Sequence, residues 1–307
     1  MSNNIKVDLI AYTPFPLDVV YTAMRCCYYA GTPNEMFQNC ESIPEEKKID
    51  LINKVIRSHH WSTIEHVSLT FAISGIDRNC SHQLVRKRIA SYSQQSLRYT
   101  NITKDCDLNE LYIIKAGNKP DEYGIEIASK YFTDVNKDNY LIYIDSLINY
   151  IEAINRGMKK ENARNMLCSN TRTNLVMTLN LRSFLDLLGH RCCTRAQLPI
   201  RVLANKMAEA VRATGEFKFI ERYLDAKCVQ NGFCDEEQSC HRKPTLKEVL
   251  SANKILNEDD TILSKNDWAQ LMNSITKKPE VNEKLAEFMK GYNEPKTGLI
   301  IEKEDKQ

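Results

Sequence analysis

A run of alternating side chains constrains what this 307-residue chain can fold into more than any other feature. Between residues 65 and 74, small or polar side chains alternate with Val67, Leu69, Phe71 and Ile73. Successive side chains of a β-strand point to opposite faces, so this period of two predicts a strand with one apolar face. Such a face has to be covered by other elements of the chain.

Other segments supply both the partners and the cover. Alternation or short apolar runs predict further strands at residues 5–13, 111–115 and 173–179. Apolar residues at helical spacing predict helices at residues 17–29, 44–59 and 119–156, with a break near residues 134–139. The interspersed pattern predicts an α+β fold, with a small, mostly antiparallel sheet covered by helices. The sequence leaves the order of the strands open.

Composition excludes several classes of protein. The chain is 42% hydrophobic and 27% charged, and its net charge of +2 is too small for a general polyanion binder. No segment reaches the roughly 18 apolar residues of a membrane span, and the amino-terminal residues do not resemble a signal peptide. We therefore expect a cytoplasmic protein that binds no membrane, whose eleven cysteines are reduced thiols.

The strongest chemical signal lies between Arg86 and Tyr99. Four cations stand there beside a group of hydroxyl and carboxamide side chains. The cations are Arg86, Lys87, Arg88 and Arg98, and the neutral groups include Tyr92, Gln94, Gln95 and Ser96. Such donors suit phosphate oxygens and a planar ring that forms hydrogen bonds, so we interpret the stretch as a nucleotide site.

The expected local structure separates these cations. Apolar residues at helical spacing predict a helix over residues 77–90, whose buried stripe includes Val85 and Ile89. In such a helix the two arginines that flank Lys87 lie about 200° apart, and we expect them to serve different ligands or different subunits. Residues 91–96 show neither period and are predicted to form a loop.

Two other interpretations of these residues stay open at this point. A basic helix end in contact with water explains the charges on chemistry alone, because cations favour the carboxyl terminus of a helix. A module for RNA or single-stranded nucleic acid would use the cations for phosphates and Tyr92 and Tyr99 for stacking. The small net charge and the absence of repeated basic and aromatic units argue against nucleic acid as a partner.

The spacing of the motif resembles the signature of the flavin-dependent thymidylate synthases. That family has Arg-His-Arg, seven residues and then Ser, whereas this chain has Arg86-Lys87-Arg88, seven residues and then Ser96. Further similarities follow in family order, at His66, Arg164, the Asn-x-Arg-Ser run that begins at Asn180, and Arg191. The resemblance covers about residues 5–243. We therefore expect a catalytic domain at residues 1–243 and a helical extension at residues 244–307.

The resemblance implies an enzyme that converts dUMP to dTMP. Methylenetetrahydrofolate is then the carbon donor, FAD the tightly bound cofactor and NADPH its reductant, and the enzyme is a homotetramer. Arg191 is implied to be the catalytic residue, which holds the pyrimidine and stabilises negative charge on its ring. The implied nucleotide-binding residues are Gln83, Arg86, Gln94, Gln95, Ser96, Arg98, Arg164 and Arg191. The implied flavin-binding residues are His66, Ser68, Arg86, Lys87, Arg88, Gln94, Asn180, Arg182, Asp186 and Arg195.

Three positions depart from the family pattern. Lys87 and Arg195 stand where many members have histidine, and Asp186 stands where many have asparagine. Lysine keeps a charge but cannot stack as an imidazole does, so a family member that has lost turnover is an alternative. Asn180 also suits the N-cap of a helix, and Arg182 and Asp186 are spaced for an exposed ion pair.

The cysteines indicate neither a metal site nor a nucleophile. Cys228, Cys234 and Cys240 are separated by more than the two to four residues typical of zinc ligands, so we expect no metal. The one Cys-His dipeptide, Cys240-His241, lies outside the arginine cluster. The implied reaction needs no thiol, because the family activates the pyrimidine electrostatically.

Overall fold

The computed structural model describes residues 5–252 of the chain. The chain divides into two compact units, Met1–Lys227 and Cys228–Gln307. The first unit contains the sheet and most of the described helices. The part of the expected helical extension beyond residue 252 lies outside the described residues.

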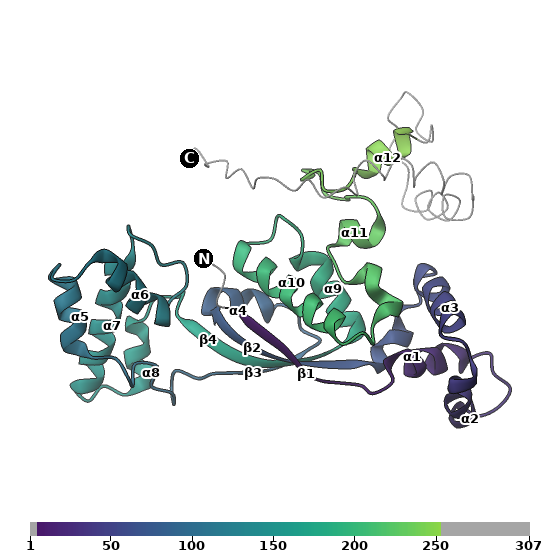
Figure 1. Ribbon diagram of the computed structural model, residues 1–307, viewed down its shortest axis with the longest axis horizontal. Coiled ribbons are helices and arrows are strands. Elements are labelled where there is room, and N and C mark those ends of the chain that lie inside the picture. The colour runs from purple at the N-terminus through teal and green to yellow at the C-terminus, as the bar shows by residue number, and fades with distance from the viewer. Residues whose placement is uncertain (1–4, 253–307) are drawn as a thin grey trace. The chain divides into compact units, whose positions relative to one another are not determined.

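A four-stranded sheet forms the centre of the first unit (Figure 1). Its strands lie in the order β1 (Lys6–Tyr12), β2 (Ser68–Asp77), β4 (Arg172–Asn180) and β3 (Ser91–Gln94). Every neighbouring pair is antiparallel. The predicted α+β class with a small antiparallel sheet is confirmed, as are the strands expected at residues 5–13, 65–74 and 173–179.

One face of the sheet is buried, as the alternation predicts. The helices on this face are α4 (Arg78–Leu84), α9 (Leu181–Arg191) and α10 (Leu198–Ala213). Leu69, Phe71 and Ile73 of β2 are buried, and the ring of Phe71 lies 5.3 Å from that of Phe184 in α9. Burial of these apolar side chains is the main force that holds the helices on the sheet.

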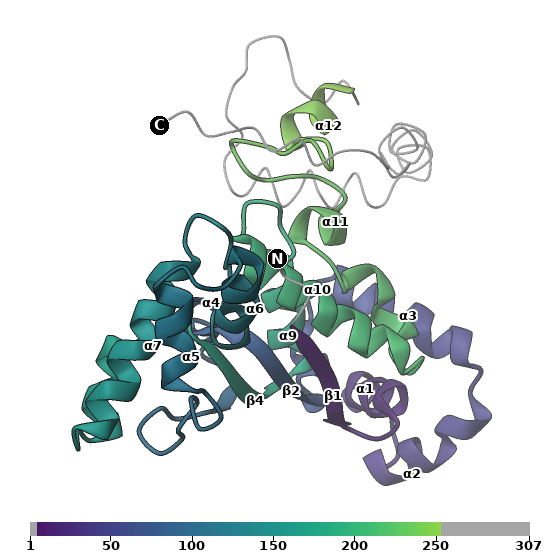
Figure 2. The same cartoon turned by 60° about the vertical axis from the view of Figure 1, so that its left-hand side comes forward.

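The opposite face of the sheet carries small and polar side chains. Ser68, Thr70 and Ala72 of β2 lie there, beside Val176 and Thr178 of β4, and all five are half-buried or exposed. Helices α9 and α10 lie on the other side of the strands (Figure 2). Within residues 5–252 this face therefore remains open to the surroundings.

Further helices gather beyond both ends of the strands (Figure 1). At one end are α1 (Pro16–Arg25), α2 (Pro33–Gln38), η1 (Asn39–Ser42), α3 (Glu45–Arg57) and η2 (Trp61–His66). At the other end are α5 (Leu108–Lys115), α6 (Asp121–Tyr131), α7 (Tyr140–Asn155), α8 (Lys160–Ala163) and η3 (Arg164–Met166). The latter group has a core of its own, which includes Ile114, Phe132, Ile144, Leu147 and Tyr150. The first unit closes with η4 (Lys218–Tyr223).

The strand predicted at residues 111–115 is wrong, because these residues form most of helix α5. Asp107 caps this helix by accepting a hydrogen bond from Asn109 N at 2.9 Å. Leu111 and Ile114 are buried in the core of the α5–α8 group. A five-residue apolar run does not distinguish a strand from a helix, so packing decides its structure.

The region between residues 77 and 94 also differs from the prediction. The helix ends at Leu84 instead of residue 90, and the expected core residues Val85 and Ile89 are 40% and 67% exposed. Lys87 N donates to Leu84 O at 3.1 Å, which turns the chain away from the helix axis. Residues 91–94, expected in a loop, form edge strand β3, because pairing with β4 outweighs their lack of an apolar pattern.

The described part of the second unit is short. It contains most of α11 (Lys227–Asn231), a bridge between Cys234 and Thr245, and α12 (Leu246–Ala252). Within residues 5–252, no group of three or more His, Cys, Asp or Glu side chains is arranged to hold a metal ion. No helix in the same range has both the length and the apolar character needed to cross a membrane.

Candidate active site

Helix α4 is fixed to the sheet by the carboxylate of Asp77. This residue ends β2 and is 4% exposed. Its Oδ1 accepts a hydrogen bond from Cys80 N at 2.6 Å, which caps the helix, and its Oδ2 accepts one from Thr133 Oγ1 at 2.6 Å. The positions of the α4 side chains relative to the sheet therefore depend on one buried acid.

Arg78, the first residue of α4, was not identified from the sequence. Its Nη1 is buried and has no hydrogen-bond partner among the described residues. Burial, and then the nearby charge of Arg164, lower the pKa of Arg78. Arg164 Nε donates to a backbone carbonyl, Glu161 O, at 3.1 Å. Two neighbouring guanidinium groups with spare donors favour an anion between them.

The carboxyl end of α4 lies beside Arg191, the last residue of α9. Arg191 Nη2 donates to Gln83 O at 3.2 Å. Arg78 and Gln83 are five residues apart in the same helix, which is about 7.5 Å along its axis. Helix α4 thus separates Arg191 at its carboxyl end from Arg78 and Arg164 at its amino end. This separation is about that between the base and the phosphate of one nucleotide.

The thiol between these arginines is unreactive. Cys80 is buried in α4, and burial, assisted by Asp77 and opposed by Arg191, raises its pKa to about 12. A thiol with this pKa is protonated at neutral pH and is a poor nucleophile. The chemistry available near Arg191 is therefore electrostatic, as the sequence implies.

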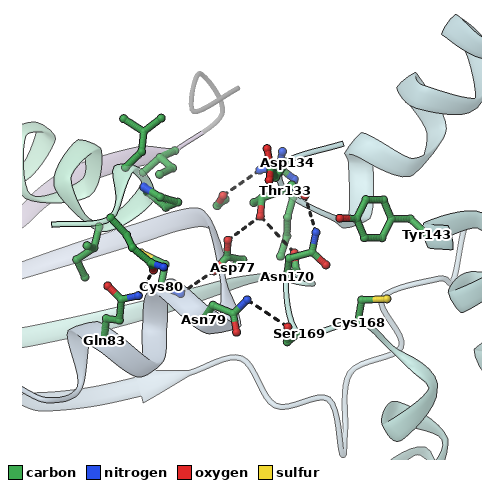
Figure 3. Close-up of a pocket in the computed structure, with 17 residues that line it drawn as sticks. Asp77, Asn79, Cys80, Gln83, Thr133, Asp134, Tyr143, Cys168, Ser169 and Asn170 are labelled. Carbon is green, nitrogen blue, oxygen red and sulfur yellow. Dashed lines mark hydrogen bonds between the residues drawn. The ribbon is translucent and has the colours of Figure 1, made fainter. Parts of the chain in front are cut away.

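A cavity of about 660 Å³ lies against α4 (Figure 3). Asn79 and Gln83 point into it from the helix, and Thr133, Ser169 and Asn170 line the facing wall. Asn79 Nδ2 donates to Ser169 Oγ at 3.2 Å, and the Gln83 carboxamide donates to Gln197 Oε1. Gln83 alone among the predicted site residues lines this cavity.

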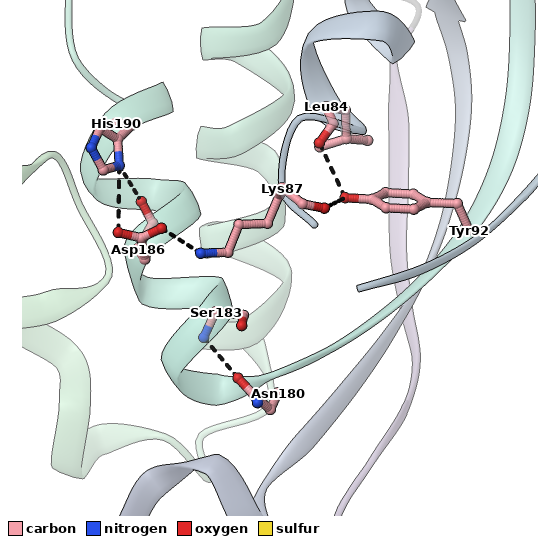
Figure 4. A network of polar contacts seen from close by, with 7 residues as sticks. All are labelled: Leu84, Lys87, Tyr92, Asn180, Ser183, Asp186 and His190. Atoms are coloured by element: carbon pink, nitrogen blue, oxygen red, sulfur yellow. Dashed lines mark hydrogen bonds and ion pairs between the residues drawn. The ribbon is translucent and has the colours of Figure 1, made fainter. Parts of the chain in front are cut away.

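The basic turn, residues 86–88, follows α4. Arg86 and Arg88 are exposed, and within residues 5–252 their side chains form no hydrogen bond or ion pair. Lys87 is half-buried and pairs with Asp186 in the middle of α9 (Figure 4). The two departures from the family pattern, Lys87 and Asp186, are therefore in contact with each other. The exposed ion pair for which Arg182 and Asp186 are spaced does not form, because Arg182 Nη1 contacts Glu65 Oε1 at 2.6 Å instead.

Strand β3 and the residues after it hold the remaining nucleotide candidates. Gln94 Nε2 donates to Ser81 Oγ and Thr173 Oγ1, at 3.0 and 3.2 Å, and Gln95 Oε1 accepts from Asn174 Nδ2 at 3.1 Å. These contacts tie the Gln94 carboxamide to α4 and β4, and the Gln95 carboxamide to β4.

Ser96 and Arg98 approach the arginine pair. Ser96 Oγ accepts a hydrogen bond from Arg98 N at 3.2 Å. Arg98 Nη2 contacts Glu161 Oε2 at 3.1 Å, and Glu161 precedes Arg164 by one helical turn. The structure therefore brings Arg98, Arg164 and Arg78 to one end of the sheet.

Four of the flavin candidates, His66, Ser68, Asn180 and Arg182, lie at the opposite end of β2 and β4, whereas Gln94 contacts Thr173 at the nucleotide end. Ser68 begins β2 and pairs with Asn180, which ends β4 and caps α9 by accepting from Ser183 N at 2.8 Å. His66 is exposed and ends η2, so its predicted place on the strand is wrong. Arg195 is exposed between α9 and α10. Nine residue steps of β2, about 30 Å, separate Ser68 from Asp77. One chain therefore does not bring all the candidates together.

Comparisons with known proteins agree on one family. The family model described as "Thymidylate synthase complementing protein" matches residues 8–214. A flavin-dependent thymidylate synthase from Pyrococcus horikoshii is 37% identical over 236 residues, which are 76% of this chain and 91% of the relative. One from Clostridium tetani is 36% identical over 248 residues, 80% of this chain and 96% of the relative. A solved Helicobacter pylori ThyX structure with FAD and dUMP has a TM-score of 0.57 and 27% identity, and the match covers 74% of this chain and 99% of that one. The chain belongs to the flavin-dependent thymidylate synthase family.

Proposed function

We propose that this protein converts dUMP to dTMP, with methylenetetrahydrofolate as carbon donor and NADPH-reduced FAD as hydride donor. Its family membership and the likeness to a ThyX structure that holds FAD and dUMP support this proposal. The observation that carries it is the arrangement along α4. Arg191 contacts the carboxyl end of this helix, and Arg78 and Arg164 lie together at its amino end.

In this proposal the chain activates the pyrimidine by charge alone. Arg78 and Arg164 hold the phosphate, and Gln83, Ser96 and Arg98 contribute further donors to the nucleotide. Arg191 stabilises negative charge on the ring, where its fixed guanidinium needs no reorganisation during the reaction. Its hydrogen bond to Gln83 O fixes the guanidinium before the substrate binds.

The residues present also fit FAD. The exposed guanidiniums of Arg86 and Arg88 have no partner among the described residues and suit the pyrophosphate. His66, Ser68 and Arg182 meet at one end of the β2–β4 pair and would hold the ring system, with Gln94, Asn180 and Arg195 as further candidates. FAD, once reduced by NADPH, supplies the hydride.

We further propose that a complete site combines residues of neighbouring protomers in a homotetramer. The separation of about 30 Å along β2 argues that the flavin end of one protomer meets the nucleotide end of another. The open face of the sheet provides a surface for such contacts. As part of this proposal, residues 1–243 are the catalytic domain, residues 244–307 a helical extension, and the enzyme is cytoplasmic.

Substitution of Arg191 tests the proposal. The purified protein should be yellow, NADPH should bleach it, and it should form dTMP from dUMP and methylenetetrahydrofolate. Arg191→Ala should lower dTMP formation at least about 100-fold, because it removes the charge that stabilises the ring. FAD affinity should stay within about threefold of the wild type, because Arg191 is not a proposed flavin ligand.

Two results would contradict this assignment. Loss of bound FAD in Arg191→Ala with unchanged turnover per flavin would place Arg191 on the cofactor instead. Binding of FAD and dUMP by the wild type without any dTMP would identify a family member that has lost turnover. Arg57→Ala, an exposed arginine on α3, is the matched control and should behave as the wild type.

A further inference from the structure

Three contacts fix the middle residue of the basic turn (Figure 4). Lys87 Nζ pairs with Asp186 Oδ2 of α9. The amide of Lys87 donates to Leu84 O at 3.1 Å, and its carbonyl accepts from the Tyr92 hydroxyl of β3 at 2.7 Å. The ammonium, amide and carbonyl of one residue are thus bound by three different elements of the fold.

Lys87 differs in burial from the arginines on either side of it. Its side chain is 17% exposed, whereas Arg86 and Arg88 are exposed. An ammonium removed from water needs a paired charge, and Asp186 supplies it. The other oxygen of Asp186, Oδ1, lies 3.6 Å from His190 Nδ1. The charge of Lys87 is therefore paired within the chain, whereas the charges of Arg86 and Arg88 remain available to a ligand.

We propose that Lys87 and Asp186 form a positioning pair, which fixes the basic turn against α9 and so presents Arg86 and Arg88 to FAD. Neither residue of the pair is then a direct ligand of the cofactor. The inference rests on the proposed function, because it assumes that FAD is what Arg86 and Arg88 bind. In this proposal Asp186 controls the orientation of the turn, although it lies 99 residues from Lys87 in the sequence.

A double-mutant cycle tests the pair. Lys87→Met removes the charge and keeps the alkyl chain, and Asp186→Asn removes the charge and keeps the shape. Asp186→Asn leaves the largely buried ammonium of Lys87 unpaired, Lys87→Met removes the partner of the exposed Asp186 carboxylate, and each should raise the dissociation constant of FAD about tenfold. Because both substitutions break the same pair, the double variant should also be about tenfold weaker than the wild type and not about 100-fold weaker. Lys54→Met, which breaks an exposed pair with Asp50, should change nothing.

Other roles of the two residues give different results. If Lys87 binds the phosphates of FAD directly, Asp186→Asn leaves FAD binding unchanged or tightens it. If Asp186 touches the flavin ring, the visible spectrum of FAD-saturated Asp186→Asn shifts from that of the wild type. Either result overturns the proposal, which predicts an unchanged spectrum in every saturated variant.

Hydrogen exchange separates this inference from the proposed function. A wild type that binds no FAD disproves the proposed function, and the pair is then judged in the protein without ligand. Faster amide exchange at residues 86–88 in either single variant, with no further increase in the double variant, supports the pair. Unchanged exchange in both single variants overturns it.

Discussion

At the residue scale, the cations of the site differ in whether the chain already neutralises them. Arg98 and Arg182 have carboxylate partners, Glu161 and Glu65, and both pairs are exposed. Exposed pairs of this kind contribute only about 0–1 kcal/mol, so a phosphate can displace the carboxylate at little cost. Arg78 has no such partner to release, because its buried Nη1 has no hydrogen bond in the described part of the chain.

Replacement of Arg78 should therefore affect substrate binding more than stability. Arg78→Met should raise the KM for dUMP about 10- to 100-fold, because a charge-assisted hydrogen bond contributes about 1.5–3 kcal/mol. Steady-state kinetics and urea unfolding measure the two effects. Unfolding should show no loss of stability, because the substitution relieves the repulsion between Arg78 and Arg164. An unchanged KM with a large loss of stability would show that Arg78 is a structural residue.

The sequence predicted the basic motif but not how its members pair. Arg191 and Arg164 follow from the family resemblance, whereas Arg78 carries no signal beyond that of an arginine at a helix start. Nothing in the sequence links the departures at Lys87 and Asp186, which lie 99 residues apart. Their contact depends on how α9 packs beside the end of α4, and no local pattern encodes that packing.

At the element scale, Asn180 joins the fold to the candidate site. It ends β4, caps α9 through Ser183 N and lies opposite Ser68. The sequence predicted this cap, because asparagine ahead of an apolar helical stripe is a strong start signal. The structure confirms the cap, and the buried side chains of α9 include Leu181, Phe184 and Leu188.

Loss of the cap should cost a measurable part of the stability. Asn180→Ala should lower the free energy of unfolding by about 1 kcal/mol, because Ser183 N loses its acceptor. Asn180→Asp keeps the acceptor and should unfold at nearly the wild-type urea concentration. Lower FAD affinity in Asn180→Asp, with stability intact, would show that the carboxamide also contacts the flavin. Equal stability of the alanine variant and the wild type would contradict the capping role.

Elements with a strong period were predicted well, and short polar or apolar ones were not. Strands β1, β2 and β4 follow from alternation, and the break between α6 and α7 falls where residues 134–139 interrupt the helical spacing. Strand β3 has a polar sequence and is a strand only because β4 offers it an edge. Helix α5 is too short for the spacing of its apolar residues to distinguish a helix from a strand.

At the scale of the whole molecule, the open face of the sheet is the feature that bears on assembly. Val176, in the central strand β4, is 40% exposed on this face. Val176→Asp should weaken contacts between protomers, because a carboxylate buried at an interface lacks a partner. Light scattering after gel filtration should show a tetramer for the wild type and smaller species for the variant.

A control on another surface makes this result specific. Ile113 of α5 is 43% exposed, and Ile113→Asp should leave the tetramer intact. A monomeric wild type, or a Val176→Asp variant that remains tetrameric with full activity, would contradict assembly through this face. Turnover should fall together with the assembly state if the site combines residues of two protomers.

Strand β3 connects the residues that we propose for FAD with those that we propose for dUMP. Its four residues follow Arg86 and Arg88 in the chain and precede Ser96 and Arg98. Pairing with β4 and the hydrogen bonds of Tyr92 to Lys87 O and of Gln94 to Ser81 hold the strand in place. A slip of this short edge by one position would reverse every side chain on it and displace both sets of donors together. In the proposed assignment, FAD bound at Arg86 and Arg88 would therefore restrict the backbone that carries Ser96 and Arg98, and the binding of either ligand would affect the binding of the other.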